Sequence, residues 1–305
     1  MVPASLRALL AHSIDYAGLF PPANLALEPA LRNHSQYVRV PESWMLGAFI
    51  LPIAEFDTAA RHLSDFDSDH PLRISALGPR TDNAEAFLKS LSASIDAIAT
   101  FQARFETASI EQLEMPLPAA VNAELLKTLR QRLDHSDLKT FWEVKADAAE
   151  RVTELLSENN AANAGRKLGF KLRTGGVTTE AFPSSAQIAM ALIAAGTRAV
   201  PIKFTAGLHH PIRLFHDSVQ TKMHGFLNVL GAGVLALEHD WRQNEVIQML
   251  DDEDAAALSF TDDLFAWRDW RISTQAIVAR RELVTSFGSC SFDEPREDLR
   301  ALKLL

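Results

Sequence analysis

GFKLRTGG (residues 169–176) and VPIKFTAGLHHP (200–211) begin and end the stretch of sequence that decides the fold. Each contains a short apolar run that carries one lysine, Lys171 in the first and Lys203 in the second, and each continues into glycine. Between them, a Ser-Ser pair precedes an apolar helical pattern that ends at a glycine, as helix start and stop signals do. The order strand, helix, strand predicts two parallel neighbours in one sheet.

The polar side chains of both strands fall on one face, because neighbouring residues of a strand point to opposite faces. Lys171 and Arg173 share a face of the first strand, and Lys203 and Thr205 share a face of the second. The opposite faces are apolar in both strands. Charge at the C-terminal end of a buried strand is typical of a (β/α) barrel, whose active site lies there. We therefore expect a barrel, with an open sheet covered on both sides as the alternative.

Strand and helix patterns alternate from about residue 46 to residue 205, with connections of ordinary length. Four further strands are expected at LGAFILPI (46–53), LRISALG (72–78), SIEQLEMPL (109–117) and LKTFWEVKA (138–146). The intervening helices are expected at AEAFLKSLSASIDAIATF (84–101), AAVNAELLKTLRQRL (119–133) and AAERVTELLSE (148–158). Such alternation favours a parallel sheet, and we expect a (β/α)8 barrel of the TIM type.

The two ends of the chain depart from this alternation, although we expect residues 1–305 to form one barrel domain. Residues 1–45 are predicted to be a helical extension, in which DYAGLFPPA (15–23) is a structural loop ended by two prolines. The alternative is that Asp15 and Tyr16 of this segment line a pocket. Residues 208–283 read as an insertion or lid that includes buried and amphipathic helices and a hairpin. TSFGSCSFDEP (285–295) is then predicted to supply the strand that closes the barrel.

Composition and charge limit the classes of function. The chain has 305 residues, 47% of them hydrophobic, and a net charge of -9, which argues against broad binding to nucleic acid or anionic membranes. A single cysteine, Cys290, excludes an internal disulfide and indicates a reducing compartment. Because no apolar run approaches the roughly 18 residues of a membrane span and no ordinary signal peptide is found, we expect a cytoplasmic protein. The sequence leaves open whether the chain forms a homo-oligomer.

If each strand turns its apolar face to the helices, the polar faces meet inside the barrel. The residues brought together in this way are Glu114, Glu143, Lys145, Lys171, Arg173, Lys203 and Thr205. Charged side chains are seldom buried without partners, so an active site at the mouth of a barrel accounts for this set better than a dry core. A purely structural ion-pair network is the alternative.

Three segments in sequence order, KLRTGG (171–176), KFTAGL (203–208) and FGSCS (287–291), resemble the deoxyribose-phosphate aldolase group of class I aldolases. That family consists of (β/α)8 barrels. The resemblance implies that Lys171 forms a Schiff base with a substrate carbonyl and that Lys203 tunes it. It also implies a phosphate-binding segment at Gly288, Ser289 and Ser291. AGLHHP (206–211) departs from the family's glycine-rich turn, and the segment up to Gly288 is longer than one helix-and-loop unit.

The chemistry expected of this set is that of a lyase or aldolase acting on a small carbonyl substrate, phosphorylated or not, with no cofactor. A lysine amine is a nucleophile only when it is deprotonated, and Lys203 and Arg173 are expected to surround Lys171 with the positive field that favours the free amine. Glu143 or Glu114 is expected to move the proton beside the imine. Lys203 has the same strand geometry as Lys171, so the sequence leaves open which of the two lysines is the nucleophile. The expected substrate-binding residues are Lys145, Arg173, Gly175, Gly176, Thr205, Gly207, His209, His210, Gly288, Ser289 and Ser291.

Two other functions remain open on the sequence. His209, His210 and His224, with Glu143, offer the ligand types of a divalent metal, which would give a metal-dependent lyase, isomerase or hydrolase. A catalytically inactive barrel that binds a ligand is the second. Cys290 is expected to be a small buried residue rather than a nucleophile.

Overall fold

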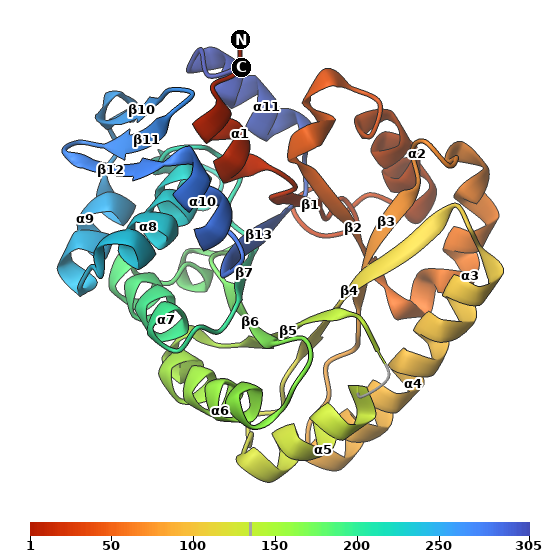
Figure 1. The fold of residues 1–305 in the computed structure, drawn as a ribbon. Helices are drawn as coiled ribbons and strands as arrows, with labels where there is room; N and C mark the ends of the chain where they lie inside the picture. The colour runs from red at the N-terminus through yellow and green to blue at the C-terminus, as the bar shows by residue number, and fades with distance from the viewer. Residues whose placement is uncertain (134–135) are drawn as a thin grey trace.

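Eight parallel strands pair side by side into a closed barrel in the computed structural model, which describes residues 1–133 and 136–305 (Figure 1). The strands follow one another around the barrel in chain order, and the last one pairs with the first. They are β1 (Ile14–Tyr16), β2 (Leu46–Pro52), β3 (Leu72–Leu77), β4 (Ala108–Pro116), β5 (Lys139–Val144), β6 (Leu168–Arg173), β7 (Ile202–Thr205) and β13 (Val284–Ser289). The predicted (β/α)8 barrel is therefore confirmed.

Helices surround the barrel and connect successive strands (Figure 1). They are α1 (Ala4–Leu10), α2 (Leu27–Tyr37), α3 (Phe56–Ala59), α4 (Ala84–Arg104), α5 (Ala123–Leu133), α6 (Ala149–Ala162), α7 (Ser185–Thr197), α8 (Phe226–His239), α9 (Gln243–Asp251), α10 (Thr274–Arg280) and α11 (Asp293–Ala301). Short 3-10 turns lie at Pro41–Met45, Ile53–Glu55, Ala60–Asp65, Ala146–Ala148, Thr179–Ala181 and Ala255–Ala257. In the described part of the chain, no helix combines the length and apolar character needed to cross a membrane.

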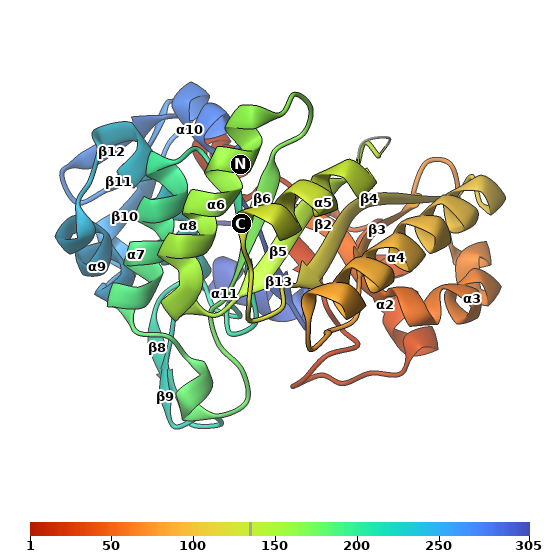
Figure 2. The same ribbon diagram turned by 90° about the horizontal axis from the view of Figure 1, so that it is seen from below.

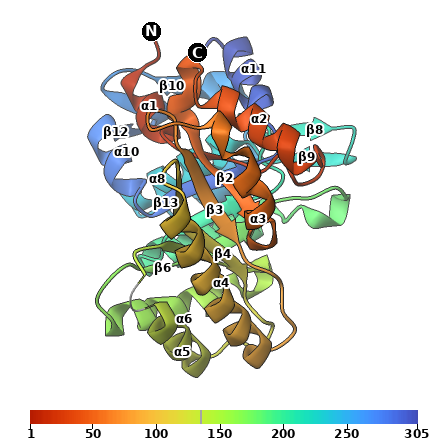
Figure 3. The same cartoon turned by 90° about the vertical axis from the view of Figure 1, so that its right-hand side faces the viewer.

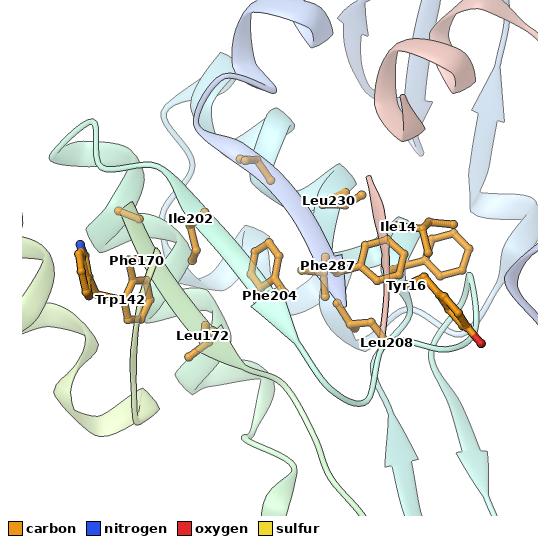
Figure 4. Packing of buried hydrophobic residues seen from close by; sticks show 14 of the residues in the cluster. Ile14, Tyr16, Trp142, Phe170, Leu172, Ile202, Phe204, Leu208, Leu230 and Phe287 are labelled. Carbon is orange, nitrogen blue, oxygen red and sulfur yellow. The ribbon is translucent and has the colours of Figure 1, made fainter. Parts of the chain in front are cut away.

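The apolar core lies between the strands and the helices. Phe170 and Leu172 of β6 and Phe204 of β7 are completely buried and point outward from the barrel toward this layer (Figure 4). Trp142 of β5 packs edge-on against Phe87 of α4. Burial of each such side chain contributes about 1.5–3 kcal/mol. Because these residues alternate with polar ones, packing of the apolar face forces the polar face inward.

The first strand of the barrel was not expected from the sequence. Ile14–Tyr16 forms β1, which pairs with β13 on one side and with β2 on the other, so part of DYAGLFPPA is barrel wall rather than loop. Three residues are too few for a period of two to be recognised. The strand is specified by its two neighbours, which supply the hydrogen bonds that its backbone needs.

The chain between β7 and β13 contains several helices and two small antiparallel sheets. A hairpin of β8 (Leu214–His216) and β9 (Thr221–Met223) comes first, and a three-stranded antiparallel sheet follows the helices α8 and α9. That sheet consists of β10 (Leu258–Phe260), β11 (Leu264–Trp267) and β12 (Trp270–Ser273). Helix α8 itself packs on β13 in the outer layer of helices. Figures 2 and 3 show the β8–β9 hairpin and the loop after β6 projecting from the same end of the barrel.

Candidate active site

A single carboxylate lies between the two lysines of the barrel interior. Lys171 of β6 and Lys203 of β7 occupy paired positions in the sheet, and both point inward. Glu114 of β4 is completely buried beside them. Its Oε2 atom lies 2.7 Å from Nζ of Lys171, and its Oε1 atom lies 2.5 Å from Nζ of Lys203. The two ammonium groups are thus bridged by one negative charge.

This bridge is the centre of a longer row of ion pairs. Beyond Lys171, Nζ lies 3.0 Å from Oε2 of Glu143, whose other oxygen accepts a hydrogen bond from Arg173 at 3.2 Å. Beyond Lys203, Nζ lies 2.6 Å from Oδ2 of Asp15. Six charges therefore alternate in sign, in the order Asp15, Lys203, Glu114, Lys171, Glu143 and Arg173.

Neutral groups hold the buried carboxylates in place. Ser75 donates a hydrogen bond of 2.5 Å to Oε1 of Glu114. Asp15 accepts hydrogen bonds from the Ser286 hydroxyl at 2.7 Å and from the backbone N–H of Ala48 at 2.6 Å. Since buried charges are costly unless they are paired and hydrogen-bonded, these contacts explain how the barrel interior tolerates them.

The ion pairs keep the carboxylates ionised. Burial alone would raise the pKa of Glu114, but the ammonium groups of Lys171 and Lys203 outweigh it and hold that pKa far below its usual range. Burial likewise opposes ionisation of Glu143, and Lys171 and Arg173 lower its pKa. The pKa of Lys203 is raised, because Asp15 and Glu114 more than offset the effect of burial. The expectation that Lys203 and Arg173 surround Lys171 with a positive field is therefore wrong. Glu114 lies between Lys171 and Lys203, and Glu143 lies between Lys171 and Arg173.

The row of charges ends in an open cavity at the C-terminal mouth of the barrel. The cavity has a volume of about 790 Å³. Lys171 and Glu143 line it, whereas Lys203 and Glu114 do not. The side chain of Lys171 keeps 4% exposure and that of Lys203 none. Much of the remaining wall is apolar and includes Phe20, Pro21, Ile50, Ile53 and Val177.

Several of the expected binding residues also line this cavity. They are Arg173, Gly176, Thr205, His209 and Gly288. Lys145 does not, because β5 ends at Val144 and the exposed Lys145 begins a 3-10 turn, where strand alternation no longer applies.

Gly175 and Gly207 do not line the cavity but allow two loops to touch. A Cβ on Gly207, whose φ is +76°, would lie 2.7 Å from Cα of Gly175.

The segment expected to bind phosphate offers no hydroxyl on the cavity wall. The Ser289 side chain is buried and is not among the cavity-lining residues, and Ser291 accepts a hydrogen bond of 3.1 Å from the backbone N–H of Glu294. The first turn of α11 also carries Asp293 and Glu294, which disfavour an anion there. Only Gly288 of the three expected residues faces the cavity.

The three histidines of the metal alternative do not converge. Nδ1 of His209 lies 3.4 Å from Glu294 and 3.7 Å from Sγ of Cys290, and His210 contacts Asp298 at 2.6 Å. Burial lowers the pKa of His209, but Cys290 and Glu294 outweigh burial and raise it to about 9. His224 contacts the carbonyl of Pro183 on another part of the molecule. Among residues 1–133 and 136–305, no group of three His, Cys, Asp or Glu side chains is arranged to hold a metal ion.

Two charged residues of the site, Asp15 and Arg80, are not in the set that the sequence predicts to converge. The sequence predicts a loop at Asp15, whereas the structure places Asp15 in β1, where it points into the barrel and contacts Lys203. Arg80, which follows β3 at the C-terminal mouth, lies 3.6 Å from Glu143 and lines the cavity.

Comparison with protein-family models and with curated proteins finds no match to this chain, so the geometry of the site carries the argument for function.

Proposed function

We propose that this protein is a lyase of the aldolase type, which makes or breaks a carbon–carbon bond through an imine on Lys171. One observation carries the proposal. Lys171 reaches the wall of a cavity of metabolite size while two carboxylates lie within 3.0 Å of its Nζ atom. Lys203, the other candidate nucleophile, has no exposed side-chain surface and is enclosed by Asp15 and Glu114. The substrate is a small carbonyl compound.

The proposed reaction begins with transfer of one proton from the Lys171 ammonium to Glu143. The free amine adds to the carbonyl carbon, and the former carbonyl oxygen leaves as water after it receives one proton from Glu143 and one from the attacking nitrogen. The electron pair of the breaking carbon–carbon bond then moves toward the positively charged imine nitrogen, while Glu143 accepts the proton of the hydroxyl group on the departing carbon, which leaves as a carbonyl compound. Glu143 returns this proton to the enamine carbon, and water hydrolyses the imine to release the second product and restore Lys171.

The other charges of the row have supporting roles in this proposal. Glu114 stays ionised beside the positive imine nitrogen and stabilises it. Lys203 fixes the orientation of Glu114 through its second oxygen. Arg173 and Arg80 hold the Glu143 carboxylate at the cavity wall. A purely structural network would not require the row to end at an open cavity.

Trapping tests the proposal. The protein is incubated with acetaldehyde, glycolaldehyde, dihydroxyacetone or pyruvate, reduced with borohydride and digested for peptide mass analysis. We expect an adduct on Lys171 that disappears in Lys171→Met and persists in Lys145→Met, a matched change at an exposed lysine. Absence of an adduct with every probe, while Lys171→Met remains folded, would favour a ligand-binding barrel without this chemistry.

A further inference from the structure

A second cavity opens at the opposite, N-terminal end of the barrel. Its volume is about 600 Å³, within the range of small-molecule sites. Its wall includes Asp15 and Gln112, the partners of Lys203 on this side. Lys203 and Glu114 line neither cavity and lie between the two. The N-terminal cavity therefore takes no part in the chemistry proposed at Lys171.

Positive charge predominates on the wall of this cavity. The charged lining residues are Arg73, Lys139, Arg166, Lys167 and Arg281 against Asp15, Glu111 and Glu282. Two of these cations have carboxylate partners, since Arg73 binds Glu111 at 2.7 Å and 2.8 Å and Arg166 binds Asp137 at 2.6 Å. Asp15 is neutralised by Lys203.

In the part of the chain that the structure describes, Lys139, Lys167 and Arg281 have no carboxylate within salt-bridge distance. Lys167 donates a hydrogen bond of 3.1 Å to the carbonyl of Ala199. Within residues 1–133 and 136–305, the guanidinium of Arg281 donates hydrogen bonds to the carbonyl groups of Val284 and Ala11, and its buried Nε atom has no acceptor there. Burial lowers the pKa of Arg281 to about 10, and the more distant Asp15 and Glu282 offset this only in part.

Arg281 is partly buried and has no carboxylate counter-ion in the described chain, which is costly, and an anion in the adjoining cavity would reduce that cost. We propose that the N-terminal cavity is a binding site for a small oxyanion, a phosphate or carboxylate group, with Arg281 and Lys139 as its principal ligands. The planar guanidinium of Arg281 suits such a group, and the Lys139 ammonium adds charge at the entrance.

A structural role for Arg281 is the competing explanation, because it ties the loop before β13 to the loop before β1. That role leaves Nε and the cavity unexplained, and it does not involve Lys139, which is exposed and makes no hydrogen bond in the described chain. Lys139→Met is therefore the variant that separates the two explanations, since it removes charge from the cavity without removing a tether.

The experiment is isothermal titration of the full-length protein with inorganic phosphate and, separately, with citrate, at constant ionic strength. We expect saturable binding of at least one probe, weakened by about tenfold or more in Lys139→Met and abolished in Arg281→Met. Arg281→Lys should restore part of the affinity, and Lys145→Met at the other end of the barrel should bind as the parent does. Non-saturable titrations with both probes, or unchanged affinity in Lys139→Met and Arg281→Met, would overturn the proposal. So would binding that Arg173→Met removes, because it would locate the anion at the C-terminal mouth.

Discussion

Lys171 and Lys203 occupy paired positions on neighbouring strands, yet their ammonium groups meet on the two oxygens of one carboxylate, Glu114, rather than facing each other. The same strand geometry thus gives two lysines with different access to solvent. Lys171 reaches the cavity at the C-terminal mouth, whereas Lys203 is enclosed in the barrel. The two lysines differ in exposure because Lys171 lies nearer to the cavity along the row of charges than Lys203 does.

Removal of the central charge should destabilise the protein strongly. In Glu114→Gln, two buried ammonium groups lose a shared carboxylate, and we expect the free energy of unfolding to fall by about 3–5 kcal/mol. Urea denaturation measures it. The control is Glu28→Gln, which removes an exposed ion pair with Arg32 and should cost about 1 kcal/mol or less. If Glu114→Gln lowers the free energy of unfolding no more than the control does, the row of ion pairs does not stabilise the fold as predicted.

Asp15 and Lys203 should be energetically coupled. Asp15→Asn leaves the buried Lys203 with Glu114 as its remaining carboxylate, and Lys203→Met leaves the buried Asp15 without its ammonium partner, whereas the double variant removes both charges. We therefore expect the double variant to be more stable than the sum of the single losses predicts, by about 1–3 kcal/mol. A double-mutant cycle from chemical denaturation gives the coupling energy. Additive losses would show that the contact contributes little.

The close approach of two loops at the mouth depends on glycine. Gly207→Ala places a side chain at φ +76°, which costs about 1–2 kcal/mol, and brings its Cβ within 2.7 Å of the backbone of Gly175. We expect lower thermal stability and a smaller yield of the Lys171 adduct, because this loop carries His209 on the cavity wall. Gly165→Ala is a matched control, since Gly165 also has positive φ but a Cβ added there would meet no atom within 4 Å. Equal trapping yields in the two variants would argue against a role for the loop contact.

Stability should fall with acid partly because of His34. Its ring is completely buried between Tyr16, Phe49 and Phe66, and neither nitrogen has a hydrogen-bond partner among the residues that the structure describes. Burial lowers its pKa to about 3. The unfolded chain takes up this proton near pH 6.5, and the folded chain does not until about pH 3. The free energy of unfolding should therefore decrease as pH falls through this window, by up to about 1.4 kcal/mol per pH unit from this group.

The variant His34→Phe isolates that contribution from the acid titration of the carboxylates. We expect its unfolding free energy to depend less steeply on pH between about 6 and 4 than that of the parent. His62→Phe, at a partly exposed histidine, is the control. Parallel pH profiles for the parent and His34→Phe would mean that the ring is already protonated in the folded protein.

The imine chemistry should be independent of metal. His209 and His210 are engaged by Glu294 and Asp298, and His224 contacts Pro183 elsewhere. We therefore expect dialysis against EDTA to leave the yield of the Lys171 adduct unchanged, and elemental analysis to find no stoichiometric divalent ion. A stoichiometric zinc, manganese or iron ion that is lost in His209→Gln would instead favour the metal-dependent alternative.

Local pattern was enough to predict most of the wall of the barrel. Phe170 and Leu172 alternate with Lys171 and Arg173, so burial of the apolar pair against helices fixes the direction of the charged pair. The same argument placed Glu114 and Glu143 inside. It failed for Lys145, which lies one residue beyond the end of its strand.

What the sequence by itself determined is therefore the order of most strands and helices and the inward face of each strand, because apolar periodicity acts within a few residues. Only the tertiary structure decided that Ile14–Tyr16 closes the barrel and that Asp15 meets Lys203, which lies 188 positions away in the chain. It also decided that carboxylates separate Lys171 from the other cations. Coulomb interactions depend on distance in space, and closure of the barrel sets those distances.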